Sequence, residues 1–222
     1  MELFKILAHD GDMKIDIWSD YICPFCTLGE RNLAIALESF EGADDVEVTW
    51  RSFQLDPNAP KEATDPYEYF EKGKGMGREQ VDQMQEMLVH RAAEVGLTFN
   101  WREAPIVNTW DAHRVGHYAR EQGKGNEWDH VVKIGYFTDG KNVADVDQLV
   151  AFGEDVGLDA DRVREIAEGK DYTDHVNAEI RSARQLGIRG VPFFIFDGKL
   201  AVSGAQPAEV FTQALSQVTQ MD

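Results

Sequence analysis

The chain has 222 residues, with 22 lysines and arginines against 40 aspartates and glutamates, so its formal net charge is −18. Such a charge repels nucleic acid and anionic membranes, and no apolar run approaches the roughly 20 residues that a membrane-spanning helix needs. We therefore expect neither a nucleic-acid nor a membrane partner. The sequence is compatible with a homodimer.

The acidic residues are spread along the chain rather than gathered in a tail, and lysine is sparse. This distribution is typical of a salt-adapted surface and predicts a halophilic, haloarchaeal source. Residues 1–12 lack the long apolar core and the cleavage site of a secretory signal. We expect a cytoplasmic protein in which residues 1–13 form an N-terminal extension.

The first predicted strand, residues 14–18, alternates apolar and polar side chains. A helix should follow, because Leu28, Leu33, Leu37 and Phe40 recur at helical intervals. Pro24 fits its first turn, where the backbone N–H has no partner inside the helix. The only two cysteines of the chain stand at this junction.

Cys23 and Cys26 form a Cys-Pro-Phe-Cys motif at the predicted helix N-terminus. The free amides and the positive end of the helix dipole stabilise a thiolate there, and a thiolate is the form that attacks disulfides. Cys26 lies one turn deeper on the same helix, close enough to resolve a mixed disulfide. The pattern favours thiol–disulfide exchange, with Cys23 as the nucleophile and Cys26 as the resolving thiol.

Two other uses of the cysteines fit the motif less well. A structural disulfide across so short a loop gives only about 2 kcal/mol in the chain-entropy description, less than longer loops give. A zinc site would need His113 and His117, which stand four residues apart on a predicted helix. The cysteines and histidines are much farther apart in sequence than in compact zinc fingers, so we expect no metal.

A second strand is predicted over residues 46–53, and a proline-containing segment then ends it. Apolar stripes predict several helices over the following hundred residues, which are too many for a single crossover connection. The chain returns through a helix that includes residues 179–186. A hairpin with an Asp197-Gly198 turn follows, and the last helix covers residues 207–218.

Pro192 stands at the head of the first hairpin strand, where it cannot donate to a ladder and needs an edge or a special peptide geometry. A cis peptide bond between Val191 and Pro192 would meet that need. A cis X-Pro bond has a low base rate, about 5–6%. Its combination with an upstream strand, a Cys-x-x-Cys motif and a helix makes it a strong expectation.

These motifs together resemble the thioredoxin-fold proteins of the DsbA class, and among them the FrnE-like branch related to 2-hydroxychromene-2-carboxylate isomerases. The resemblance extends over nearly the whole chain from Met13 onward. The motifs that carry it are residues 19–26, residues 50–55, Asn108-Thr109 with residues 112–114, residues 187–193 and residues 203–206.

The resemblance implies an α/β protein, a thioredoxin fold with an inserted all-helical domain. We expect the thioredoxin-like domain over residues 14–58 and 172–222 and the inserted domain over residues 59–171. It also implies a cis Pro192 facing the cysteines. The residues expected to contact substrate are Pro24, Phe25, Asn108, Val191 and Pro192.

Two polar residues, Glu30 and Asn108, each allow two interpretations. Glu30, two helical turns after Cys23, is either a buried proton acceptor or a solvated helix residue. Asn108 either lines a substrate cleft or caps the helix that follows it, and capping is the favoured role.

The function expected from the resemblance is protein disulfide oxidoreductase, acting by dithiol–disulfide exchange on protein or small thiols. No cofactor is expected beyond the redox-active cysteines, with glutathione as a candidate co-substrate. The Pro-Phe dipeptide between the cysteines lacks the imidazolium of strongly oxidising relatives, so we expect a less oxidising couple. The alternatives are a glutathione-dependent isomerase or transferase of small aromatic or polyketide-like substrates, and a non-catalytic metal-binding or chaperone-like module.

Overall fold

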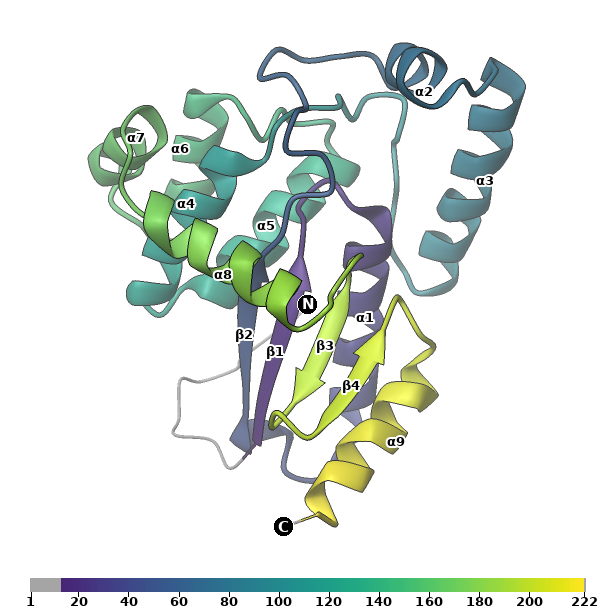
Figure 1. Ribbon diagram of the computed structural model, residues 1–222, viewed down its shortest axis with the longest axis vertical. Coiled ribbons are helices and arrows are strands. Elements are labelled where there is room, and N and C mark those ends of the chain that lie inside the picture. The colour runs from purple at the N-terminus through teal and green to yellow at the C-terminus, as the bar shows by residue number, and fades with distance from the viewer. Residues whose placement is uncertain (1–12, 222) are drawn as a thin grey trace.

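A four-stranded mixed sheet forms the centre of the molecule (Figure 1). The computed structural model describes residues 13–221. The strands are β1 (Met13–Ser19), β2 (Val46–Ser52), β3 (Phe193–Phe196) and β4 (Leu200–Ser203), in the spatial order β2-β1-β3-β4. β1 runs parallel to β2 and antiparallel to β3, while β3 and β4 form an antiparallel hairpin.

Alternation along β1 explains how the sheet is covered. Ile15 and Ile17 are completely buried, whereas Lys14 is exposed and Asp16, between the two isoleucines, is half-buried. The two isoleucines pack with Leu33 and Leu37 of α1 (Pro24–Glu38) and with Phe211 of α9 (Ala208–Thr219). Both helices therefore cover one face of the sheet, and the strand predicted over residues 14–18 is confirmed.

Helix α8 (Thr173–Gln185) lies across the other face, in front of the sheet in Figure 1. The indole Nε1 of Trp18 donates to the carbonyl oxygen of Glu179 on this helix at 3.3 Å. The hairpin that follows turns at Asp197 and Gly198, which both have positive φ angles of 48° and 67°. The sequence therefore predicted this Asp-Gly hairpin correctly.

Between β2 and α8 the chain forms a helical region. A short 3-10 helix (Ala43–Asp45) comes before β2. The helices after β2 are α2 (Pro66–Lys74), α3 (Arg78–Glu94), α4 (Trp110–Glu121), α5 (Gly125–Phe137), α6 (Val146–Asp155) and α7 (Ala160–Glu168). Aspartates at the N-caps of α2, α6 and α7 each accept a backbone N–H of the first turn, which fixes where these helices begin. The arrangement is a thioredoxin fold with helices inserted after β2, as expected.

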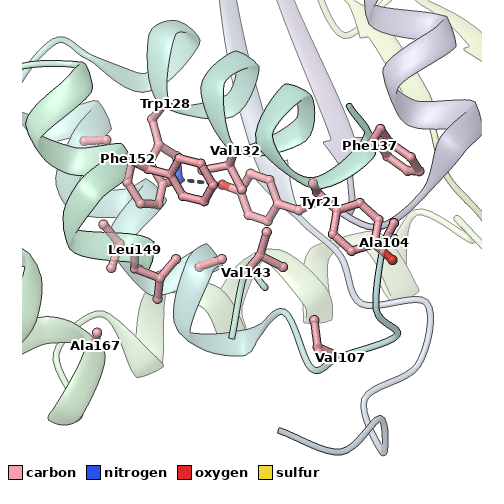
Figure 2. Packing of buried hydrophobic residues seen from close by; sticks show 14 of the residues in the cluster. Tyr21, Ala104, Val107, Trp128, Val132, Phe137, Val143, Leu149, Phe152 and Ala167 are labelled. Atoms are coloured by element: carbon pink, nitrogen blue, oxygen red, sulfur yellow. Dashed lines mark hydrogen bonds between the residues drawn. The ribbon is translucent and has the colours of Figure 1, made fainter. Parts of the chain in front are cut away.

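The core of the helical region reaches the cysteine motif (Figure 2). Tyr21 and Leu28, which flank the two cysteines in sequence, belong to the same buried cluster as Trp128 and Val132 of α5. Trp128 Nε1 donates to the Tyr21 hydroxyl at 3.0 Å, the bond drawn as a dashed line in Figure 2. Residues on both sides of the Cys-x-x-Cys motif are thus packed against the inserted helices.

Among the residues described, no helix is long and apolar enough to cross a bilayer.

Candidate active site

Cys23 is the N-cap residue of α1, and Pro24 is the first residue of the helix. The carbonyl oxygen of Cys23 accepts the backbone N–H groups of Cys26 and Thr27 at 3.0 and 3.3 Å. Both cysteines are free thiols and buried, with exposed fractions of 2% and 1%. The pair is therefore set at a helix N-terminus.

The loop before β3 lies against this pair. The Val191–Pro192 peptide bond is cis, as predicted, and the thiol of Cys23 donates to the carbonyl oxygen of Val191 at 3.7 Å. A Cβ placed on Gly29 of α1 would come within 2.9 Å of Pro192 Cγ, so the proline ring rests directly on the helix backbone. The structure thus brings Cys23, Val191 and Pro192 together from positions 168 residues apart.

Apolar surface lies beside the pair. Phe25, between the two cysteines, is 37% exposed, and the guanidinium of Arg91 on α3 lies 5.7 Å from its ring centroid. Leu55, which follows β2, is 48% exposed, and its backbone N–H donates to Asp20 three residues before Cys23. Pro24 is half-buried. An extended thiol substrate approaching Cys23 would meet this apolar surface.

Glu30 is buried beneath the pair, with an exposed fraction of 5%, so the solvated interpretation is wrong. It accepts from Lys133 Nζ at 3.0 Å and from His130 Nδ1 at 3.2 Å. Lys133 is completely buried, also donates to Asp129, and lies 3.9 Å from the ring centroid of Trp50. Three residues of the inserted helix α5 therefore surround the acid that α1 contributes.

The two carboxylates that bind Lys133, Glu30 and Asp129, differ in their pKa values. Burial opposes ionisation of Glu30, but the charge of Lys133 and the hydrogen bond from His130 outweigh it and lower the pKa of Glu30. Burial raises the pKa of Asp129 to about 7, because Lys133 offsets only part of that effect and Glu30 adds repulsion. Glu30 is thus the ionised partner, while Asp129 titrates near neutral pH.

The resolving thiol is strongly perturbed. Burial, and then contact with the Cys23 thiol, raises the pKa of Cys26 well above its ordinary value, while the nearby charge of Lys133 acts in the opposite direction. Cys26 therefore ionises only with help from its surroundings. Sequence reasoning missed Asp129, His130 and Lys133. The available signal was an Asp-Lys pair four residues apart in α5, with apolar residues at Val131, Val132 and Ile134.

The Asn108 side chain has a structural role. Its amide nitrogen donates to the carbonyl oxygens of Pro57 and Ala59 at 3.2 and 3.1 Å, and its amide oxygen accepts from Gln54 and from the backbone of Trp110. The side chain thus joins the loop after β2 to the start of α4, which is close to the capping role that the sequence favours. The N-cap residue itself is Thr109.

The two histidines that a zinc site would need have other partners. His113 Nε2 lies 3.3 Å from Asp20 Oδ1. Burial lowers the pKa of His117, so its imidazole is neutral near pH 7, and its Nε2–H donates to Glu179 at 3.2 Å. Neither histidine is joined to the cysteines in a group of metal-ligating residues within residues 13–221.

A thiol pair at a helix N-terminus opposite a cis-proline loop can be compared with known proteins. The family model of the DSBA-like thioredoxin domain matches residues 14–216. The chain belongs to the DSBA-like thioredoxin family. This DSBA-like protein is 32% identical over 206 residues to the uncharacterized protein YwbO of Bacillus subtilis (strain 168), over 92% of this chain and 96% of YwbO.

Solved structures agree with this membership. A probable DsbA oxidoreductase from Streptomyces coelicolor superposes on the DSBA-like protein with a TM-score of 0.89 and 40% identity, covering 95% of this chain and 91% of the other. A 2-hydroxychromene-2-carboxylate isomerase has a TM-score of 0.68 at 14% identity, covering 94% and 97% of the two chains. At that identity the likeness shows the fold alone. The resemblance to the DsbA class is confirmed.

Proposed function

We propose that this DSBA-like protein is a thiol–disulfide oxidoreductase acting on protein disulfides or dithiols. The observation that carries the proposal is the position of Cys23. It is the N-cap residue of α1, and its thiol donates a hydrogen bond to the carbonyl oxygen of Val191, beside the cis Pro192. Cys26 lies one helical turn further along α1. Backbone groups at a strand head are suited to hold an extended peptide next to the reacting sulfur. Pro24, Phe25, Val191 and Pro192 then form the substrate surface.

In the reductive direction, the Cys23 thiolate attacks one sulfur of a substrate disulfide, and the other sulfur leaves as a thiolate. Cys26 then loses its proton and attacks Cys23, the mixed disulfide breaks, and the substrate leaves as its second thiolate. Two electrons pass from the cysteine pair to the substrate, and the pair ends as a disulfide. Oxidation of a substrate dithiol is the reverse of these steps.

We also propose a cytoplasmic location and a weakly oxidising couple, so that reduction or isomerisation is the direction of use. The support is the Pro-Phe dipeptide, which places no imidazolium beside Cys23. A fold neighbour with 15% identity and a TM-score of 0.65 is a cytosolic disulfide reductase, DsbM, from Pseudomonas aeruginosa. Glutathione is a candidate electron donor for the pair.

The test is a redox titration of the Cys23–Cys26 pair against glutathione in high salt, with insulin reduction and refolding of scrambled ribonuclease measured on the same sample. We expect a two-electron transition and turnover, and complete loss of both activities in Cys23→Ser. Cys26→Ala should accumulate a mixed disulfide at Cys23, visible by mass spectrometry.

Two results would contradict the proposal. A pair that does not cycle with glutathione, or full turnover in Cys23→Ser, would exclude thiol–disulfide exchange at this site. Glutathione-dependent turnover of a small double-bond substrate that survives Cys26→Ala would favour the isomerase or transferase reaction instead.

A further inference from the structure

The guanidinium of Arg91 lies at the rim of the cysteine pair. Arg91 is in the last turn of α3, and its Cζ is 5.7 Å from the ring centroid of Phe25, which stands between Cys23 and Cys26. Its Nη2 donates to the carbonyl oxygen of Ala205, in the loop after β4, at 3.4 Å. One side chain of the inserted region therefore reaches both the start of α1 and this loop.

The loop that holds Arg91 is fixed to the active site. The backbone N–H of Gly204 donates to the carbonyl oxygen of Pro192 at 2.9 Å, and Pro192 belongs to the loop that lies against the cysteines. The side chain of Asn32, which is buried on α1, donates to the carbonyl oxygen of Gln206 at 2.8 Å. Residues on both sides of Ala205 are therefore bonded to the elements around the reactive thiol.

The charge of Arg91 has no carboxylate partner within residues 13–221, where its polar and ring contacts are the Ala205 carbonyl oxygen and the Phe25 ring. Arg31 of α1, by contrast, pairs with Glu38 at 3.0 Å. A guanidinium has five N–H donors in a planar fork that fits a carboxylate with two hydrogen bonds. Most of this fork remains available, since Arg91 is only half-buried.

The surroundings make this cation informative about the substrate. The whole chain carries a net charge of −18, which disfavours the approach of an anionic molecule. A cation without a carboxylate partner at the rim of the thiol pair offsets this repulsion where the substrate binds. The anionic groups of peptide and protein thiols are carboxylates, so the chemistry that Arg91 recognises best is a carboxylate near the reacting sulfur.

We propose that Arg91 binds a carboxylate of the thiol or disulfide substrate and thereby makes the protein select acidic substrates. This inference rests on the proposed function and names its substrate class. The carboxylate belongs either to a small acidic thiol such as glutathione or to an acidic side chain beside a substrate cysteine. Arg91 is a specificity-determining residue, because electrons pass only between the sulfur atoms and the guanidinium holds the substrate meanwhile.

The experiment compares three small disulfides with the reduced full chain: the dianion 3,3′-dithiodipropionate, the neutral bis(2-hydroxyethyl) disulfide and the dication cystamine. Alkylation and mass spectrometry at timed intervals give the rate of oxidation of the cysteine pair. Each rate constant is divided by that of 2-mercaptoethanol with the same disulfide, which removes intrinsic reactivity. The salt concentration is about 0.1 M, where charges act over about 10 Å.

We expect the wild type to prefer the dianion to the neutral disulfide in spite of its net charge. Arg91→Gln should slow the reaction with the dianion by roughly 5- to 20-fold and change the reaction with the neutral disulfide by less than about twofold. The order should then be reversed, with cystamine the fastest, because the overall negative charge is no longer offset at the site.

Arg78→Gln is the matched control. Arg78 begins the same helix, also lies over an aromatic ring, that of Tyr67 at 4.7 Å, and has no carboxylate partner within residues 13–221. It is about 20 Å from Arg91 along the helix axis. Its variant changes the net charge by the same amount and should keep the wild-type preference.

Two further substrates identify the source of the carboxylate. Oxidised glutathione represents the small thiol, and a peptide disulfide with glutamate beside each cysteine, compared with its glutamine analogue, represents the protein substrate. Slowing by Arg91→Gln that is confined to glutathione assigns a small acidic thiol, and slowing confined to the glutamate peptide assigns an acidic protein segment. No slowing with either substrate overturns the proposal.

The neutral disulfide separates this inference from the proposed function. Equal slowing of all three small disulfides in Arg91→Gln, or an equal loss of preference in Arg78→Gln, would overturn the inference alone. If Arg91→Gln does not fold, the wild type decides, because a normalised rate lower for the dianion than for the neutral disulfide also overturns it. A wild type that reacts with none of the disulfides and does not reduce insulin would overturn the proposed function as well.

Discussion

The missing side chain at Gly29 lets the Pro192 loop lie on the helix that carries the cysteines. A Cβ there would meet Pro192 Cγ at 2.9 Å and Phe194 Cζ at 3.0 Å. Gly29→Ala should therefore push the loop away from Cys23 and cost about 1–3 kcal/mol of unfolding free energy, as overpacking does. Urea unfolding and the insulin-reduction rate check this, and both should fall together.

The control is Gly73→Ala in α2, where nothing lies within 4 Å of the added Cβ. This variant should gain up to about 1 kcal/mol from helix propensity and keep full activity. If Gly29→Ala matches Gly73→Ala in stability and rate, the loop does not depend on close contact with α1.

Among the elements, α8 is joined to the sheet and to α4 through one carboxylate. Glu179 accepts from Ser52 N at 2.7 Å, from Arg51 at 3.2 Å and from Arg120 at 3.1 Å, and it also contacts His117. Burial opposes its ionisation, but the hydrogen bond from His117 and the charge of Arg120 outweigh burial and lower the pKa of Glu179 far below its ordinary value. The carboxylate therefore stabilises the fold in its ionised form.

Glu179→Gln should cost about 3 kcal/mol at pH 7, since it leaves two partly buried arginines and the buried N–H of Ser52 without their acceptor charge. The wild-type contribution is fully present above the ordinary carboxyl pKa of 4.5 and is lost as pH falls below it toward the folded-state value. Urea unfolding from pH 7 to pH 3.5 should show the gap between variant and wild type narrowing below pH 4.5. Glu47→Gln, on an exposed pair with Lys14, should change stability by less than about 1 kcal/mol, and an equal loss there would contradict the assignment.

The elements near the cysteines were predictable because their signals are local. Alternation in β1, a proline in the first turn of α1 and an Asp-Gly turn each act within a few residues. The charged cluster was not predictable in this way, because His130 and Lys133 meet Glu30 across 100 and 103 residues of sequence. Only the packing of α5 against α1 decides that contact.

The domain boundaries at residues 58, 59, 171 and 172 stay predictions, and residues 1–12 of the expected extension lie outside the described part of the chain.

At the scale of the whole molecule, the net charge of −18 opposes compaction. Salt shortens the screening length from about 10 Å at 0.1 M to about 3 Å at 1 M, which relieves this repulsion. We expect the melting temperature to rise by roughly 4–8 °C between these concentrations of potassium chloride, equivalent to about 2 kcal/mol for a chain of this size. Thermal melts followed by circular dichroism measure it.

A triple variant at the exposed acids Glu41, Glu62 and Glu154, each changed to Gln, provides the comparison. It should gain stability at 0.1 M salt and show a smaller rise with added salt. A wild-type melting temperature that does not move with salt would argue against a salt-adapted surface, and the halophilic source would lose its support.

The outer strand of the sheet has a further consequence for the molecule in concentrated solution. β2 forms one border of the sheet, and the outward backbone groups of a border strand are where a strand of another molecule would pair. Arg120 donates to the carbonyl oxygen of Trp50, and Glu179 accepts the N–H of Ser52. These two side chains occupy the places of an incoming strand, so the charged residues that join α4 and α8 to the sheet also protect the protein against edge-to-edge aggregation.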